Sequence, residues 1–401
     1  MFYIVYKNIM KKYKLTEINI NQKGGDIKCK KFPNLPTVIE IDKQKTNRII
    51  AIGDIHGDLD LAINLLIVAK VILEIPSKEK HSVKLIYKNE KKKYFKWIAE
   101  KTIVIQVGDQ IDRCRPFNAG CQDKNETYLD EASDIKILIF YYKLHLLALK
   151  QGCALYSLLG NHEILNVIGN LDYVSYLGLM EFNKKKEKDI FKKRKNIFKI
   201  DSKKKFYKNN NLATFLACTR QSAIIVGDYL FVHAGIIDKL IKRFNKSEDN
   251  RLNLTLINNI IKKWLLNDLS DLKDQENINK LLLDKELSPF WPRFFGNLEP
   301  NLTADNKLCI DNINPILNYF EIKGIVVGHT PQLNININST CNNTLWRVDV
   351  ASSLAFNNII DSNSITNESR SPQILEISLD PKKNDIYKVY KLLSNGKIVV
   401  I

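Results

Sequence analysis

The sequence predicts a layered α/β fold with a ligand site where the strands end. Short apolar runs bounded by turn residues alternate with longer helical patterns along most of the 401 residues. This alternation is typical of sheets covered by helices. Polar clusters directly follow five of the apolar runs. Because loops converge at strand ends in α/β folds, these clusters predict a ligand site there.

The first part of the chain supplies strand and helix patterns in alternation. In order, they are TVIEID from Thr37 and NRIIAIGD as two short strands, 58–71 as a helix, KTIVIQVGD as a buried strand, 135–150 as a helix, and CALYSLLGNHE as a strand that ends at a polar cluster. Together they predict stacked layers of strands and helices.

A lysine-dense stretch at about 181–208 interrupts this alternation and shows no clear apolar face, so we interpret it as an insertion. For this stretch and for the basic run at 87–96, a solvated insertion or helix face is the simpler interpretation, and a docking surface is the alternative. The elements expected next are AIIVGDYLFVHAG as two strands, 252–287 as helix, KGIVVGHT and TLWRVDVAS as strands, and a final sheet with an Asn-Gly hairpin turn. We expect one domain at 37–401 after an extension at 1–36.

Composition narrows the class of protein. Hydrophobic residues make up 45% and charged residues 26% of the chain, which is typical of ordered globular proteins. The net charge of +17 predicts a surface that attracts anions such as phosphate, phosphoproteins, nucleic acid or acidic lipid headgroups. No apolar run approaches the roughly 18 residues of a membrane helix. The opening MFYIVYKNIMKKYKL also lacks the cleavage pattern of a signal peptide.

The seven cysteines are scattered and form no CxxC pair. This pattern predicts reduced thiols in an intracellular protein, which we place in the cytoplasm or nucleus. Cys114 and Cys121 flank one of the polar clusters, so the fold can bring them together.

The five polar clusters carry the candidate site. They are GDIHGD at 53–58, GDQIDR at 108–113, GNHE at 160–163, HAG from His233 and GHT from Gly328. Four of the six histidines fall in them, and burying so many polar groups without a cation would cost several kcal/mol. Carboxylate, imidazole and amide ligands suit Mn, Fe or Zn better than Ca, and the absence of thiolates disfavours a structural zinc site. The ligand set implies two ions.

One local condition applies to the first cluster. Asp54 and His56 are separated by one residue in an extended segment, so both can reach one ion only if the chain turns between them. Gly53 and Gly57 permit such a turn.

In this order, GDxHG, GDxxDR, GNHE, HAG and GH resemble the motifs of the calcineurin-like metallophosphoesterase superfamily. The sequence most resembles the phosphoprotein phosphatase branch and its bacterial-type, Shewanella-like protein phosphatases, from about Ile49 to Ala355. The resemblance implies a four-layer α/β/β/α sandwich with a two-metal site at the C-terminal strand ends. It also implies a ligand set in which Asp54 and His56 bind the first metal, Asp109 bridges, and Asn161, His233 and His329 complete the second.

The resemblance further implies the reacting groups. A metal-bridging hydroxide attacks phosphorus in line, His162 protonates the leaving oxygen, Asp112 orients His162, and Arg113 grips the phosphate. A histidine beside a carboxylate suits that role and contributes roughly 10² to 10⁴-fold. The SPFWPR segment resembles a bacterial-type Trp-x-Arg element, which makes Arg293 a candidate second phosphate contact, and Arg220 competes for that role. Manganese is the metal expected, with iron, zinc or magnesium as alternatives.

Two features favour phosphomonoesters as substrates. Pro331 stands where nucleases and phosphodiesterases of the superfamily carry a second histidine, and the Asp112-Arg113 pair resembles the monoesterase side. The expected partner is a phosphoserine or phosphothreonine protein or a small phosphomonoester, with phosphotyrosine as an alternative. Cys114 departs from the usual DRG motif, and DVASSL departs from DVGMS.

Two other functions stay open from the sequence. The first is hydrolysis of dinucleoside polyphosphates, because that branch shares GDIHG and GHTPQ-like endings. The second is a non-catalytic, basic nucleic-acid or scaffold-binding protein, which the lysine-rich stretch favours. The absence of a recognised RNA or DNA module opposes it. The sequence sets no oligomeric state.

Overall fold

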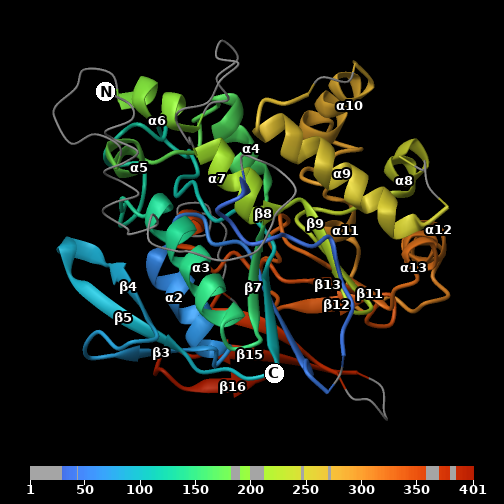
Figure 1. Cartoon of the computed structure of the whole chain (residues 1–401), viewed down its shortest axis with the longest axis horizontal. Helices are drawn as coiled ribbons and strands as arrows, with labels where there is room; N and C mark the ends of the chain where they lie inside the picture. The colour runs from blue at the N-terminus through green and yellow to red at the C-terminus, as the bar shows by residue number, and fades with distance from the viewer. Residues whose placement is uncertain are drawn as a thin grey trace.

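The computed structural model describes residues 29–42, 44–181, 190–198, 212–244, 248–269, 272–357, 370–379 and 385–401. Most of the predicted extension at 1–36 and most of the predicted insertion at 181–208 lie outside these residues. Within them, two large sheets pack against each other and helices cover their outer faces (Figure 1). This arrangement confirms the predicted four-layer sandwich.

The first large sheet has seven strands in the order β16-β15-β14-β2-β6-β7-β8. Its centre is parallel, with Ile50 of β2 opposite Val104 of β6 and Ile105 opposite Tyr156 of β7, and its β14 to β16 edge is antiparallel. The strands are β2 (Arg48–Ile52), β6 (Thr102–Gln106), β7 (Ala154–Leu158), β8 (Arg220–Gln221), β14 (Gln373–Ser378), β15 (Ile386–Leu392) and β16 (Ile398–Val400).

The second large sheet has six strands in the order β1-β9-β10-β11-β13-β12. β9 and β10 form the expected two-strand unit, with Gly227 at φ 57° in the turn between them. β11 pairs in parallel with both β10 and β13. The strands are β1 (Val38–Ile39), β9 (Ala223–Val226), β10 (Tyr229–Val232), β11 (Gly324–Val327), β12 (Asn338–Thr340) and β13 (Leu345–Arg347).

Alternation along the strands builds the layers, because successive side chains point to opposite faces. Ile49 of the first sheet and Phe231 of the second lie in one core between the sheets. Ile50 instead packs with α2 (Leu59–Val68) and α3 (Asp134–Leu149). Val232 packs outward with α9 (Asn250–Leu265) and α13 (Asn314–Phe320).

The remaining helices are short. The segment expected to be helical at 252–287 divides into α9 and α10. The others are α4 (Asn161–Ile168), α5 (Tyr176–Met180), α6 (Ile190–Phe198), α7 (Leu212–Thr219), α8 (Asp238–Phe244), α10 (Leu272–Leu283), α11 (Phe294–Asn297), α12 (Lys307–Asn312), η3 (Lys88–Glu90) and η4 (Leu354–Phe356). Among the described residues, no helix is both long and apolar enough to cross a membrane.

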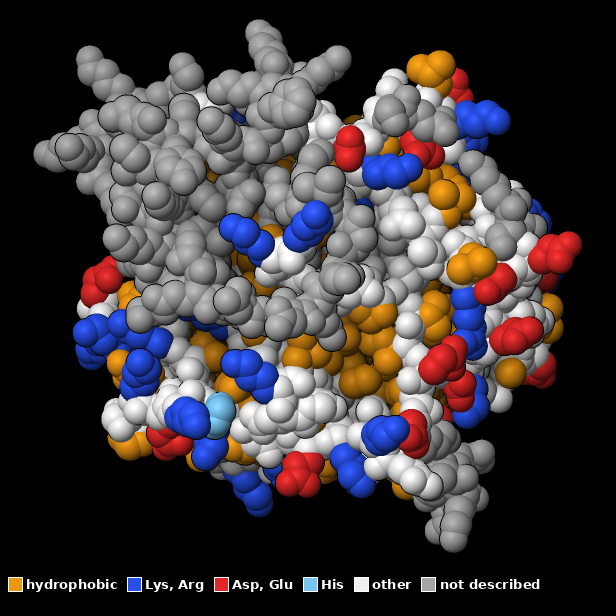
Figure 2. All heavy atoms as spheres, in the orientation of Figure 1, with side chains coloured by type: hydrophobic (Ala, Val, Ile, Leu, Met, Phe, Trp, Pro, Cys, Tyr) orange, Lys and Arg blue, Asp and Glu red, His pale blue; other side chains and the backbone are white. Residues whose placement is uncertain are grey.

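A small third sheet corrects the interpretation of the basic run at 87–96. The run ends in β5 (Lys92–Trp97), which pairs with β3 (Ile72–Ile75) and β4 (Ser82–Ile86). Phe95 and Trp97 are buried on one face of β5, and the exposed Lys96 lies between them. Figure 2 shows Lys and Arg side chains gathered at the lower left of the molecule, where β4 and β5 lie in Figure 1. The run is therefore a half-buried strand and not a helix face.

The described part of the predicted insertion is also less solvated than expected. Helix α6 lies inside 181–208, and its Arg194 and Phe198 side chains are both fully buried. The lysine density hid these two inward-facing positions, which are four residues apart and so share one face of the helix.

Three disulfides correct the expectation of reduced thiols. They join Cys29 to Cys218, Cys114 to Cys121 and Cys309 to Cys341, and Cys153 stays a free, buried thiol. Cys29 and Cys218 are 189 residues apart in sequence, yet their Cα atoms are 5.3 Å apart. The expected proximity of Cys114 and Cys121 is confirmed, whereas spacing along the chain did not reveal the other two pairs. The predicted cytoplasmic or nuclear location rested on reduced thiols, so the disulfides remove that argument for it.

A buried histidine outside the site predicts a pH effect on stability. Burial lowers the pKa of His145 in α3 to about 4, from an ordinary value of 6.5. The folded state therefore binds a proton at His145 less tightly than the unfolded state does. The stability that is fully present above pH 6.5 is lost progressively as the pH falls from 6.5 through about 4. The histidine accounts for about 3 kcal/mol of that loss.

Chemical denaturation at pH 7 and pH 4.5 checks this expectation. His145→Leu should reduce the difference in unfolding free energy between the two pH values, whereas His81→Leu, at an exposed position, should leave it unchanged. An unchanged difference in His145→Leu would show that other groups cause the acid sensitivity.

Candidate metal centre

The structure brings all five predicted polar clusters to one place. Each follows the end of a strand, three from the seven-stranded sheet and two from the six-stranded sheet. The residues are Asp54 and His56 after β2, Asp109 after β6, Asn161 and His162 after β7, His233 after β10, and His329 after β11. All seven side chains are buried.

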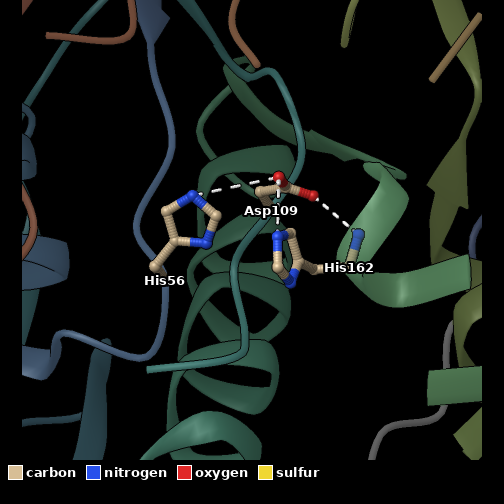
Figure 3. Close-up of side chains that lie close together, drawn as sticks. All are labelled: His56, Asp109 and His162. Atoms are coloured by element: carbon tan, nitrogen blue, oxygen red, sulfur yellow. Dashed lines mark hydrogen bonds and ion pairs between the residues drawn. The ribbon is translucent and has the colours of Figure 1, made fainter. Parts of the chain in front are cut away.

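Two groups of side chains have the spacing of metal ligands. His56, Asp109 and His162 form the first, and Asp109, His233 and His329 form the second. Within each group the ligand atoms lie within 4.8 Å of one another. Figure 3 shows both rings of the first group turned toward the Asp109 carboxylate. Asp109 therefore stands at the junction of two adjacent sites.

The backbone bends sharply at these residues. His56, Asp109 and His329 adopt φ values of 45°, 52° and 66°, in a left-handed region that costs non-glycine residues energy and is concentrated at functional sites. The turn expected between Asp54 and His56 thus lies at His56 itself and at Gly57, which has a φ of 64°.

Two glycines let the clusters approach each other. A Cβ atom at Gly160 would collide with the Asp109 carboxylate, and one at Gly328 would collide with that of Asp54. Their place in the motifs is thus explained by close packing of the strand ends.

The other predicted ligands border the two groups. Asp54 accepts the backbone N–H of His329 at 3.2 Å, and its carboxylate lies 3.6 Å from His56 Nε2. Asn161 Oδ1 lies 2.9 Å from His233 Nε2. His233 donates its Nδ1 proton to the Val107 carbonyl, which turns Nε2 toward Asp109 at 3.3 Å.

The charge balance of the site fits a cation. Burial, Asp349 and Asp109 raise the pKa of Asp54 well above its ordinary value. Burial also raises the pKa of Asp349 to about 6, and its Oδ2 atom has no hydrogen-bond partner among the described residues. Although burial opposes it, the neighbouring His233 and His162 hold the pKa of Asp109 well below the usual range. Three buried carboxylates and a set of imidazoles suit borderline divalent ions.

Glu163, the last residue of GNHE, fixes the loop that carries Asp109. Its carboxylate accepts backbone N–H groups of Gly160 at 2.7 Å, Asp109 at 3.0 Å and Gln110 at 2.9 Å. This carboxylate therefore joins the ends of β6 and β7.

A histidine-carboxylate pair lies beside the first group. His162 Nδ1 is 2.9 Å from Asp112 Oδ2, which leaves His162 Nε2 facing Asp109 at 3.9 Å. Asn166 Nδ2 donates to both Asp112 oxygens, at 2.8 and 2.9 Å. The structure therefore brings together the two residues that the sequence paired.

The predicted arginines take different positions. Arg113 is buried against two carboxylates, with Nη1 3.3 Å from Asp58 and 3.4 Å from Glu131. Arg220 is buried away from the two groups, where it donates to Gln110 Oε1 and the Leu138 carbonyl. Arg293 is exposed at the edge of the site, with Nη1 3.4 Å from the His329 carbonyl.

An arginine that the sequence interpretation missed enters the site. Arg115 Nη2 lies 2.8 Å from His56 Nε2 and 3.4 Å from His162 Nε2. Its guanidinium also lies over the rings of Phe356, at 4.8 Å, and Tyr173, at 5.6 Å. The Cys114–Cys121 disulfide closes the loop that carries it.

Two of the missed residues had a signal in the sequence. Asp349 follows β13 and so obeys the same strand-end rule as the five recognised clusters. Glu163 occupies the third position of α4, where a glutamate commonly caps the helix. Arg115 had no comparable signal, because the path of its loop depends on the disulfide.

Comparisons with known proteins agree with this geometry. A family model described as calcineurin-like phosphoesterase matches residues 47–333. An uncharacterized protein of Acanthamoeba polyphaga mimivirus is 36% identical over 269 residues, which cover 65% of this chain and 100% of that protein. Shewanella-like protein phosphatase 2 of Arabidopsis thaliana is 25% identical, over 79% of this chain and 74% of that protein.

Two further similarities span most of the chain. Shewanella-like protein phosphatase 1 of Plasmodium berghei is 27% identical, over 85% of this chain and 80% of that protein. The crystal structure of a cold-active protein-tyrosine phosphatase of a Shewanella species has a TM-score of 0.58 at 18% identity, over 96% of this chain and 89% of that one. That structure shows the same fold.

Proposed function

Because this chain belongs to the calcineurin-like phosphoesterase family, we propose that it is a metal-dependent phosphatase that hydrolyses phosphomonoesters on proteins. The observation that carries the proposal is the position of Asp109, which lies in both candidate metal groups beside a histidine-carboxylate pair. Such an arrangement would hold two cations next to an acid, and hydrolysis of a phosphate ester requires both.

The family uses a binuclear divalent metal centre, and the donor set here suits one. We assign Asp54 and His56 to the first ion, Asn161, His233 and His329 to the second, and Asp109 to both. Manganese is proposed as the metal, with iron, zinc or magnesium as alternatives. When bound, the two ions supply Lewis acidity that ionises a water molecule and neutralises phosphate oxygens.

The residues of the chain supply the proton. Water provides the oxygen of the new P–O bond and releases a proton to solvent, while the old P–O bond breaks with its electron pair on the leaving oxygen. The His162 imidazolium donates its Nε2 proton to that oxygen and becomes neutral. Asp112 keeps the ring oriented by accepting the Nδ1 proton at 2.9 Å.

Two lines of support favour a protein substrate. The relatives in Arabidopsis thaliana and Plasmodium berghei are both named protein phosphatases. In addition, the rings of Tyr173 and Phe356 lie 5.0 Å from His162 and 5.3 Å from His56, so apolar and aromatic groups flank the acid. We propose phosphoserine and phosphothreonine proteins as substrates, and the two rings make phosphotyrosine the specific alternative.

A phosphopeptide panel tests the proposed function. Enzyme stripped of metal and reloaded with Mn, Zn, Fe or Mg should release inorganic phosphate from phosphopeptides, and the apo enzyme should not. Release of mononucleotides from a dinucleoside polyphosphate, with no activity on the panel, would overturn the proposal. Absence of turnover with every metal and substrate would support a binding protein instead.

The phosphate contact is assigned to Arg115, with Arg293 as a second candidate. Arg113 already pairs with Asp58 and Glu131, whereas Arg115 lies among the imidazoles of the site. Arg115→Ala should lower kcat/KM by about 10²-fold, because a charge-assisted contact to the phosphate is lost. Arg115→Lys should retain part of the activity.

Steady-state kinetics with a matched control check this assignment. Lys124→Ala changes an exposed cation in the same connection between β6 and α3, just outside the disulfide-closed loop, and should leave kcat/KM unchanged. If Arg113→Lys, with unchanged thermal stability, lost more kcat/KM than Arg115→Ala, the phosphate contact would belong to Arg113, as the sequence predicted.

A further inference from the structure

A buried arginine from the lysine-rich segment lies in the shell behind the proposed acid. Arg194 belongs to α6, and its side chain is 0% exposed. A buried guanidinium is costly unless carboxylates and hydrogen bonds compensate it. Its partners therefore show what the residue does.

Arg194 contacts the segments that surround Asp112. Its Nη2 atom donates to Asp112 Oδ1 at 3.1 Å and pairs with Asp134 Oδ2 at 2.7 Å. Its Nε atom donates to Asn166 Oδ1 at 2.8 Å, and its Nη1 atom donates to the Gly178 carbonyl at 3.1 Å. One side chain thus ties α6 to α3, α4, α5 and the loop after β6.

The two oxygens of Asp112 contact different partners. Oδ2 faces His162 Nδ1, while Oδ1 faces Arg194. Asn166 Nδ2 contacts both oxygens, and the bond from Arg194 Nε to Asn166 Oδ1 keeps that amide group facing Asp112. Arg194 therefore holds the carboxylate directly and also through Asn166.

We propose that Arg194 is a positioning residue for the acid, so that α6 completes the active centre from within the lysine-rich segment. This inference rests on the proposed function, because it assumes that His162 donates a proton. Arg194 holds Asp112, Asp112 holds His162 Nδ1–H, and His162 Nε2 is thereby aimed at the leaving oxygen. Without Arg194, Asp112 loses its direct contact to Oδ1, and the Asn166 amide that contacts both oxygens loses the partner of its own Oδ1, so the direction of the His162 ring is less firmly fixed.

A purely structural role is the alternative, since Arg194 also compensates Asp134. The two roles differ in their dependence on the substrate. An acid matters most when the leaving oxygen is strongly basic, and it matters little for a nitrophenolate that leaves unaided. Loss of positioning should therefore depend on the leaving group, whereas loss of folded protein should lower all rates equally.

Arg194→Met removes the charge at similar length, and Lys195→Met on the same helix is the control because Lys195 is exposed. With Mn-loaded enzyme, Arg194→Met should lower kcat for alkyl phosphates by about 10-fold to 100-fold and for p-nitrophenyl phosphate by less than about 3-fold. Lys195→Met should match the wild type for every substrate. Equal losses across the leaving-group series would overturn the proposal.

Two further measurements keep the test decisive. If Arg194→Met does not fold, Arg194→Lys replaces it, because lysine keeps the positive charge but lacks the planar guanidinium. Arg194→Lys should show a smaller loss of kcat with the same dependence on the leaving group. In NMR spectra of the Mg-loaded enzyme, the His162 Nδ1–H resonance should shift or broaden in both Arg194 variants. An unchanged resonance would overturn the positioning role. A wild-type enzyme without phosphatase activity would overturn the proposed function. The positioning role could still be judged in that case, because the His162 Nδ1–H resonance is measured without turnover.

Discussion

Replacing Asp109 with Asn should reduce hydrolysis by at least about 10³-fold, equivalent to about 4 kcal/mol of transition-state stabilisation. Asp109 contributes to both candidate metal groups, so this one change removes an anionic ligand from each. His233→Ala, which affects one group, should also abolish hydrolysis at limiting metal.

Metal analysis of the purified protein separates this effect from misfolding. Asp109→Asn should bind fewer ions per chain than the wild type and retain its far-UV circular dichroism. Asp311→Asn, at an exposed position, should bind the same number of ions and keep full activity. Hydrolysis of an aryl phosphate at the wild-type rate by Asp109→Asn would disprove the two-metal mechanism.

Replacing His162 with Asn should reduce kcat for alkyl phosphates by roughly 10² to 10⁴-fold. The variant should still bind two ions, because Asp54 and His56 are the residues assigned to the first ion. The distinction is informative, since His162 also lies within ligand distance of His56 and Asp109. The loss should be smaller for p-nitrophenyl phosphate, whose leaving group needs little protonation.

The comparison variant is His81→Asn, which changes an exposed histidine and should leave kcat unchanged. Loss of one bound ion in His162→Asn would identify His162 as a ligand and reject its role as the acid. Measurement of ions per chain alongside kcat therefore decides between the two roles.

Much of the site was predictable because strand ends converge in this fold. Asp109 and His233 are 124 residues apart, yet each follows an apolar run that could be recognised from the sequence alone. The strand pattern placed both at one edge, and the structure has their side chains 3.3 Å apart. Local sequence was sufficient because the sheet supplies the long-range geometry.

Contacts that depend on the path of a loop were not predictable. Arg194 meets Asp112 across 82 residues of sequence, and no periodic pattern links α6 to the loop after β6. The pairing of Cys29 with Cys218 likewise joins residues 189 positions apart, which no local pattern links. In β5, the exposed Lys92 and Lys96 concealed the two-residue period that places Phe95 and Trp97 on the buried face. The basic composition of the run therefore outweighed its period in the interpretation.

The origin of the two ligand groups has a consequence for folding. The first group comes entirely from the seven-stranded sheet, whereas His233 and His329 of the second come from the six-stranded sheet and Asp109 from the other. An ion in the second group would cross-link the two sheets, and its binding energy would become resistance to their separation. At a free-ion concentration 100 times its dissociation constant, mass action adds about 2.7 kcal/mol to the stability of the native state. Both ions would thus take part in the reaction, while only the ion in the second group would also cross-link the two large sheets.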